Sequence, residues 1–181
     1  MAFVLDRGLL PQTIGSLAEL VHVLEHESKP SGFSDAMLRF RPSLDEMLAF
    51  AMWDHRHYTR QCIHGSPAYE LLLICYEAGQ RTSIHDYDSQ MAWIKPVLGN
   101  MREERFRTAK GHDLVLKGVK FLSPGSISYM GTGNPIHRHS NPGPGRAMTI
   151  NLYSKPIRRW RVYDQRTGTA RLAGLSGTVP E

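Results

Sequence analysis

The chain has 181 residues, 41% of them apolar and 22% charged, which is the composition of an ordinary globular protein. No stretch approaches the roughly 18 apolar residues of a membrane span, and the N-terminus has no signal-peptide pattern. The formal net charge is +5, but the basic residues are scattered, and the densest cluster, Arg158, Arg159 and Arg161, reads as a solvated strand face. We therefore expect no nucleic-acid and no membrane partner. Two cysteines, Cys62 and Cys75, are too few for a disulfide framework and favour a cytoplasmic setting.

The N-terminal part of the chain has helical patterns. Residues 12–27 place apolar side chains at helical spacing, and Ser16 begins a capping-box pattern there. A second helix is predicted over about 43–53, where the same pattern recurs, and a short helical turn over 33–40. We expect residues 1–57 to form a helical segment packed on the rest of the domain.

From Tyr58 onward, short β-rich runs alternate with Gly, Pro, Asn and Ser. The apolar run 71–75 predicts a strand buried on both faces. In the polar strand that follows, His85 and Tyr87 share one face because side chains alternate with period two. A second apolar strand ends at a tight turn beginning with Gly99. The expected strands are 70–77, 82–87, 90–98, 101–108, 113–120, 126–130, 135–139, 146–153 and 159–164.

Short strands at this spacing predict a sandwich or barrel rather than alternating βαβ units. The expected organisation is one domain. Its barrel covers residues 58–168 and follows the helical segment, and residues 169–181 form a C-terminal tail. We expect the part after Thr167 to be a loose strand or coil.

Three of the nine histidines stand out as candidate metal ligands. His85, His137 and His139 lie in the β-rich part, and the last two share a face if their segment is extended. A histidine that faces the interior of a β-rich domain is a candidate ligand. The other six have no partner at ligand spacing and are interpreted as surface or packing residues: His22, His26, His55, His57, His64 and His112.

The spacing around these histidines resembles the two motifs of the cupin superfamily, G-x5-H-x-H-x4-E-x6-G and H-x3-N. Gly79 precedes His85 with five residues between them, and Tyr87 stands where the motif has its second histidine. His137 is followed by Asn141 at the spacing of the second motif. Two half-motifs about fifty residues apart suit a jelly-roll barrel that aims both into one cavity.

Within that superfamily, residues 58–168 resemble the cysteine dioxygenase family through six short motifs in order. The motifs are Tyr58-Thr59-Arg60, Ser83-Ile84-His85-Asp86, Leu98-Gly99-Asn100, Ile136-His137-Arg138, Leu152-Tyr153-Ser154-Lys155-Pro156 and Asp164-Gln165-Arg166-Thr167-Gly168. The resemblance implies a mainly β fold, a cupin double-stranded β-helix (jelly-roll barrel) with N-terminal α-helices packed outside.

The resemblance also implies roles for individual residues. His85 and His137 match iron-binding histidines, and Arg60 matches the arginine that holds the substrate carboxylate. Tyr153 matches the active-site tyrosine that faces the substrate, and Tyr58 lies beside Arg60, so both count as candidate catalytic and substrate-binding residues. In the family, L-cysteine chelates Fe(II), and both atoms of O2 go to its sulfur to give cysteine sulfinate.

The sequence departs from the family pattern at the metal site. Tyr87 replaces the third histidine, Ala92 stands where animal enzymes have a tyrosine-crosslinked cysteine, and Asn151 replaces the histidine that hydrogen-bonds the active-site tyrosine. Three ligand sets stay open: His85, His137 and a Tyr87 phenolate, the same histidines with His139, or the two histidines with water. Asp86 and Asp88 alternate to the opposite face and are weaker candidates.

The expected function is that of a non-haem, metal-dependent oxygenase acting on the sulfur of L-cysteine or a close thiol amino acid with O2. The expected cofactor is Fe(II), with Ni(II) or another divalent ion as alternatives, because ligand identity alone does not determine the metal. One alternative function is natural product biosynthesis, in which cysteine is oxidatively decarboxylated and rearranged, for example to a sulfonamide-bearing aldehyde. The other is a non-catalytic, small-molecule-binding cupin. The sequence predicts a monomer or a small homo-oligomer.

Overall fold

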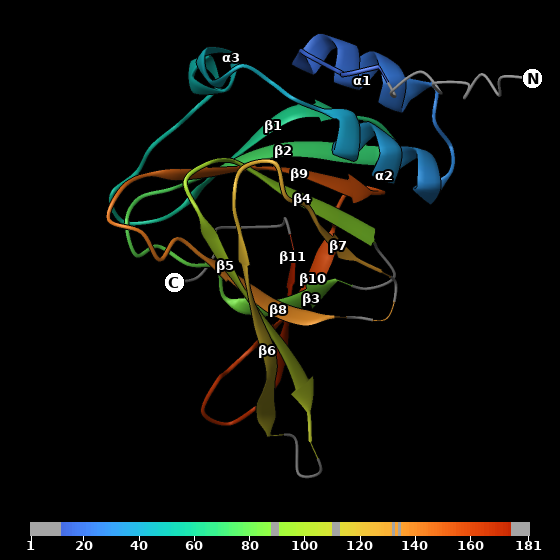
Figure 1. The fold of residues 1–181 in the computed structure, drawn as a ribbon. Coiled ribbons are helices and arrows are strands. Elements are labelled where there is room, and N and C mark those ends of the chain that lie inside the picture. Colours follow the sequence, from blue (N-terminus) through green and yellow to red (C-terminus); the bar gives the residue numbers. More distant parts are fainter. Residues whose placement is uncertain (1–11, 88–90, 110–112, 132, 134, 175–181) are drawn as a thin grey trace, which may run out of the picture.

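Two antiparallel β-sheets face each other, and three helices cover the outer face of one of them (Figure 1). This computed structural model describes residues 12–87, 91–109, 113–131, 133 and 135–174. The N-terminal residues 1–11, Asp88, His112 and the tail beyond residue 174 lie outside the described residues. None of the described helices has the length and apolarity that crossing a membrane requires.

The first two helices begin with recognisable capping signals. Helix α1 (Leu17–Glu25) is capped by Ser16, whose Oγ accepts a hydrogen bond from the N–H of Glu19 at 3.2 Å. Helix α2 (Pro30–Arg39) has a proline in its first turn, where the missing N–H leaves no hydrogen bond unmade. The short helical turn predicted over 33–40 is therefore part of a longer helix.

Helix α3 (Leu44–Ala49) begins where the sequence predicts, because Ser43 caps it. It ends at Ala49 rather than near Trp53, so the prediction is wrong at this end. The chain turns after it, and the carboxylate of Asp54 accepts the N–H of Arg56 at 2.7 Å. An aspartate that satisfies nearby backbone donors in this way stabilises a turn at the expense of a helix.

The five-stranded sheet has the order β1-β2-β9-β4-β7. Its strands are β1 (Thr59–Gly65), β2 (Tyr69–Tyr76), β9 (Ala147–Ser154), β4 (Met91–Leu98) and β7 (Ser128–Met130). Strand β1 is missing from the predicted strands. It is an edge strand that pairs with β2 alone, and its polar residues give no apolar run to detect.

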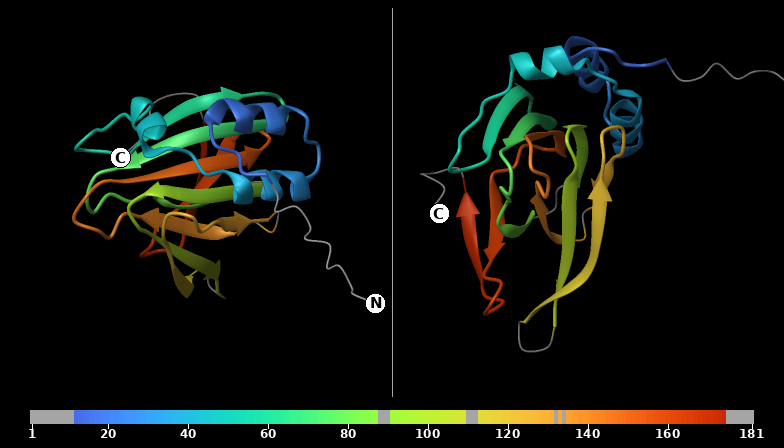
Figure 2. Two further views of the ribbon diagram at one scale, coloured as in Figure 1. Left: turned by 45° about the horizontal axis from the view of Figure 1, so that its top comes forward. Right: turned by 60° about the vertical axis from the view of Figure 1, so that its left-hand side comes forward.

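The six-stranded sheet has the order β11-β10-β3-β8-β5-β6. Its strands are β11 (Ala170–Gly174), β10 (Arg159–Tyr163), β3 (Ile84–Tyr87), β8 (Ile136–Ser140), β5 (Met101–Thr108) and β6 (Leu114–Leu122). Strand β11 pairs antiparallel with β10, which gives the beginning of the C-terminal tail a defined place at the sheet edge. Figure 2 shows the helices on the five-stranded sheet and the long β5–β6 hairpin extending away from them.

Period-two alternation divides the apolar residues of β2 between two cores. Leu71 and Leu73 pack under the helices together with Trp93 of β4, whereas Leu72 and Ile74 face the space between the sheets. The predicted strand buried on both faces is thereby confirmed. The second core leaves room at one side of the barrel for polar residues, and the candidate site lies there.

Candidate active site

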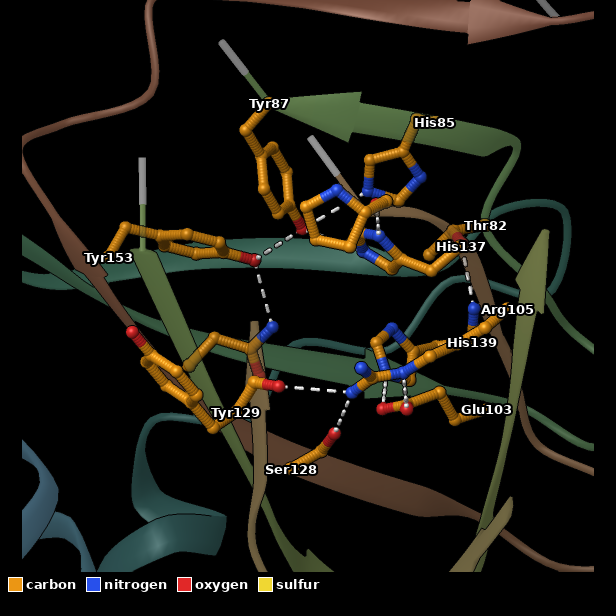
Figure 3. A network of polar contacts seen from close by, with 12 residues as sticks. Thr82, His85, Tyr87, Glu103, Arg105, Ser128, Tyr129, His137, His139 and Tyr153 are labelled. Carbon is orange, nitrogen blue, oxygen red and sulfur yellow. Dashed lines mark hydrogen bonds and ion pairs between the residues drawn. The ribbon is translucent and has the colours of Figure 1, made fainter. Parts of the chain in front are cut away.

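Three polar atoms from the six-stranded sheet converge inside the barrel. The Nε2 atoms of His85 and His137 each lie 3.1 Å from the hydroxyl oxygen of Tyr87 (Figure 3). Strands β3 and β8 place His85 directly opposite His137, so both rings leave the same face of the sheet. Tyr87 follows His85 by two residues and shares that face.

Backbone carbonyls determine the tautomer of both imidazoles. The Nδ1–H of His85 donates to the carbonyl of Ser83 at 2.8 Å, and that of His137 donates to the carbonyl of Pro135 at 2.7 Å. Each Nε2 therefore carries a lone pair that points toward Tyr87. Burial lowers the pKa of His85 to about 4 and that of His137 well below its usual value, so both rings are neutral near pH 7.

This arrangement fits a divalent cation. A phenol has one hydrogen and can donate to only one of two acceptor nitrogens, so one lone pair is left for another partner. Ligands bound about 2.1 Å from one ion at roughly right angles lie about 3 Å apart, close to the two 3.1 Å separations. Among the described residues, no group of three or more His, Cys, Asp or Glu is placed to hold a metal.

His139 lies on the same face but is held by a buried carboxylate. Its Nε2 is 3.2 Å from Glu103 Oε2, and the other oxygen of Glu103 accepts from Arg105 Nε at 2.6 Å (Figure 3). Burial by itself raises the pKa of Glu103, but these hydrogen bonds outweigh it and bring the pKa to about 2. The ionised Glu103 therefore accounts for one of the two ring nitrogens of His139, whereas the Tyr87 hydroxyl contacts the Nε2 atoms of both His85 and His137.

The five-stranded sheet contributes Tyr153 from β9. Asn151 Nδ2 donates to the Tyr153 hydroxyl at 2.9 Å, and that hydroxyl lies 3.5 Å from the hydroxyl of Tyr87. Asn151 thus makes the contact that the family's histidine makes in the expected pattern. Its Oδ1 is buried and has no hydrogen-bond partner among the described residues, as expected for an atom that meets water or a ligand. Ala92 lies opposite Tyr153 in register, so a methyl group occupies the crosslink position.

The two remaining predicted residues lie at the start of strand β1, Arg60 within it and Tyr58 directly before it. The guanidinium carbon of Arg60 lies 5.9 Å from the ring centroid of Trp160, and Tyr58 stacks on Tyr76 at 5.5 Å between centroids. No carboxylate of the described residues forms an ion pair with Arg60. Trp160 was not predicted as a site residue. In the sequence it alternates with arginines, and this pattern by itself indicates a solvated strand. Only the position of the facing sheet shows that Trp160 lines the cavity.

These side chains surround a cavity of about 1000 Å³. Its lining includes Arg60, His85, Tyr87, Tyr153 and Trp160, contributed by both sheets. His137 is fully buried behind this surface and is connected to it through the Nε2 contact with Tyr87.

The opposite face of the six-stranded sheet has a structural role. Asp86 points there, as predicted, and its Oδ2 accepts from Arg161 Nη2 at 2.7 Å and from the Tyr163 hydroxyl at 2.8 Å. Arg161 was predicted to lie on a solvated strand face and instead anchors a buried carboxylate.

Comparison with known proteins identifies the family and supports the fold. The family model described as "Cysteine dioxygenase type I" matches residues 10–166. Human cysteine dioxygenase type 1 is 27% identical over 170 residues, which cover 88% of this chain and 83% of the relative, and the bovine protein is 26% identical with the same coverage. A solved structure from Klebsiella pneumoniae, titled as an uncharacterized conserved protein with a double-stranded β-helix domain, is similar with a TM-score of 0.53. It is 13% identical and covers 71% of this chain and 87% of its own, which supports the predicted jelly-roll fold.

Proposed function

Because the chain belongs to the cysteine dioxygenase type I family, we propose that it is a metal-dependent oxygenase acting on the sulfur of L-cysteine or a close thiol amino acid. In this reaction the thiol and one O2 give one sulfinic acid, so the sulfur is oxidised and both oxygen atoms are retained. The observation that carries the proposal is the convergence of two neutral imidazole nitrogens and a phenol oxygen beside a cavity lined by Arg60, which forms no ion pair with a described carboxylate.

His85, His137 and Tyr87 are the residues that would hold the metal, which is Fe(II) in our proposal. When bound, the metal supplies the redox chemistry that O2 needs in order to react with a thiol. The chain itself prepares the two nitrogens for this task, because Ser83 and Pro135 occupy both Nδ1–H groups and leave Nε2 unprotonated.

Arg60 binds the substrate carboxylate in this proposal. A guanidinium forms two parallel hydrogen bonds with a carboxylate, and this fixes the orientation of the rest of the molecule. The ring of Trp160 supports the guanidinium and covers one side of the cavity. A substrate held by its carboxylate at Arg60 presents its thiol toward His85 and Tyr87, which line the same cavity.

Tyr153 holds a proton beside the reacting sulfur. Its oxygen already accepts a hydrogen bond from Asn151, so its own hydrogen points away from the amide. The hydrogen is available to the Tyr87 oxygen at 3.5 Å or to the substrate. Asn151 performs this orientation without a titratable group, unlike the histidine of the family pattern.

Tyr87 is the reason for a second candidate reaction. A phenol that loses its proton is an anionic ligand where the family has a neutral imidazole, and this changes the electronic properties of the site. The second candidate is oxidative decarboxylation of cysteine with transfer of its nitrogen to sulfur. That reaction consumes two O2 and releases one CO2 and one water for each sulfonamide-bearing aldehyde.

Oxygen stoichiometry separates these functions. The protein would be purified anaerobically, its metal content measured, and the protein then supplied with Fe(II), Ni(II) or Mn(II) in turn. Cysteine and ¹⁸O-labelled O2 would follow, with an oxygen electrode and mass spectrometry as readouts. We expect one O2 per cysteine and a sulfinate carrying two labelled oxygens. Two O2 with CO2 release would establish the second reaction, and cysteine binding without O2 uptake under any metal would refute an oxygenase.

A further inference from the structure

The cavity is large and positively charged. Its lining contains four arginines and, among the described residues, no aspartate or glutamate: Arg56, Arg60, Arg81 and Arg171. A volume of about 1000 Å³ is at the upper end of small-molecule sites and far exceeds what free cysteine would fill. Free cysteine also has a single carboxylate, which Arg60 alone would bind.

Strand register places one further arginine on the inner face. Arg171 of β11 lies opposite Val162 of β10, and Val162 lies opposite His85 of β3. Side chains in one such row leave the same face of a sheet, so Arg171 and His85 point to the same side. Two strand spacings of about 4.8 Å separate their Cα atoms by about 10 Å.

Arg81 also lines the cavity, but its positive charge already acts on a carboxylate of the protein. It forms a bridge with Ser140, which lies opposite Arg102. Arg102 pairs with Glu104, and the positive charge of Arg81 contributes to lowering the pKa of that same carboxyl group. The charge of Arg81 is therefore partly compensated on the other side of the sheet.

Arg60 and Arg171 lie on the edge strands of different sheets. Strand β1 is the edge of the five-stranded sheet and β11 the edge of the six-stranded sheet, and residues of both strands line the cavity. Trp160, which lies beneath Arg60, neighbours β11 through its partner Ala173. Arg171 forms no ion pair with a described residue, so its charge is available to a ligand.

We infer that the natural substrate is a thiol with two carboxylates, one held by Arg60 and the second by Arg171. This inference rests on the proposed function and extends it to the class of substrate. Neither guanidinium forms an ion pair with a carboxylate of the described residues, and a dianionic ligand would form a charge-assisted pair with each of them. A peptide-linked cysteine with an acidic neighbour has the required groups and uses more of the available volume.

Two dipeptides of nearly equal size test the second carboxylate. Cysteinyl-glutamate and cysteinyl-glutamine both keep a free thiol and a free amine, and they differ in one carboxylate. Binding would be measured anaerobically by calorimetry with the purified protein, independently of turnover. We expect cysteinyl-glutamate to bind about tenfold more tightly, as one charge-assisted pair provides.

Matched variants locate the effect. Arg171→Gln should abolish the preference for the acidic dipeptide, and Arg171→Lys should retain part of it because the charge remains. Arg159→Gln removes the same charge from the opposite face of the neighbouring strand and should leave the preference intact. Circular dichroism would verify that each variant is folded.

The outcomes distinguish the second carboxylate site from the proposed oxygenase activity. Equal binding of the two dipeptides by the unmodified protein would overturn the inference, and Arg171 would then be an edge-strand charge that discourages sheet pairing. A preference that survives Arg171→Gln would overturn it as well. Oxidation of cysteine without any dipeptide preference leaves the proposed function standing and removes only the second carboxylate. A preference abolished by Arg171→Gln without O2 uptake refutes the oxygenase and keeps the dianion site.

Discussion

The half-buried His85 and the fully buried His137 should make the metal-free protein unusually sensitive to mild acid. Burial lowers the pKa of His85 to about 4, whereas a histidine in an unfolded chain titrates near 6.5. Between these values the unfolded state binds more protons than the folded state, so stability falls as the pH falls from about 6.5 toward 4. The pKa of His137 is shifted in the same direction for the same reason.

The size of the effect follows from proton linkage. For one histidine with these two pKa values, lowering the pH from 7 to 5 reduces the free energy of unfolding by about 2 kcal/mol. Glu103 has little effect on the change in unfolding free energy between pH 7 and 5. Its pKa is about 2 in the folded protein, so the stability that it contributes is lost only as the pH falls below about 4.5.

Urea unfolding of the chelator-treated protein at pH 7, 6 and 5 would measure this dependence. The variant His85→Asn cannot titrate at that position, so its loss of stability between pH 7 and 5 should be smaller than that of the wild type by about 2 kcal/mol. The variant His22→Asn changes an exposed histidine of α1 and should keep the full wild-type dependence. An identical pH dependence in the wild type and His85→Asn would refute a neutral imidazole with a lowered pKa at this position.

Three further changes test the surroundings of the site. Tyr87→Phe removes the hydroxyl between the two imidazoles and should weaken divalent metal binding by about 10–100-fold in a metal titration. Unchanged metal affinity would exclude Tyr87 as a ligand. Asn151→Leu removes the donor to Tyr153 and should lower kcat by about tenfold with little change in KM. Asn151→His should restore kcat. Full activity of the leucine variant would argue against an orienting role for Asn151. Asp86→Ala removes the carboxylate that accepts hydrogen bonds from Arg161 and Tyr163, and it should reduce the unfolding free energy by about 2 kcal/mol. Metal affinity should not change, because this carboxylate lies on the opposite face of the sheet. An altered metal titration would contradict that separation.

Local sequence signals were sufficient wherever a feature depends on a few neighbouring residues. The caps at Ser16 and Ser43, the strand buried on both faces and the shared face of His85 and Tyr87 all follow from spacing of two to four residues. Where local signals compete or are weak, the predictions are wrong. Helix α3 ends at Ala49, ahead of the turn that Asp54 stabilises, and the polar edge strand β1 lacks an apolar run.

The sequence by itself determined the fold class, the family and the candidate residues of the site, because alternation and short motifs are properties of adjacent residues. Only the tertiary structure decided how those residues meet. The contact of Tyr87 with His137 joins residues 50 positions apart, and the contact of His139 with Glu103 joins residues 36 apart. The positions of Trp160 and Arg171 on the cavity lining depend on strand order and register across both sheets. Such pairings follow from how whole strands bury their apolar faces, and a single stretch of sequence does not encode them.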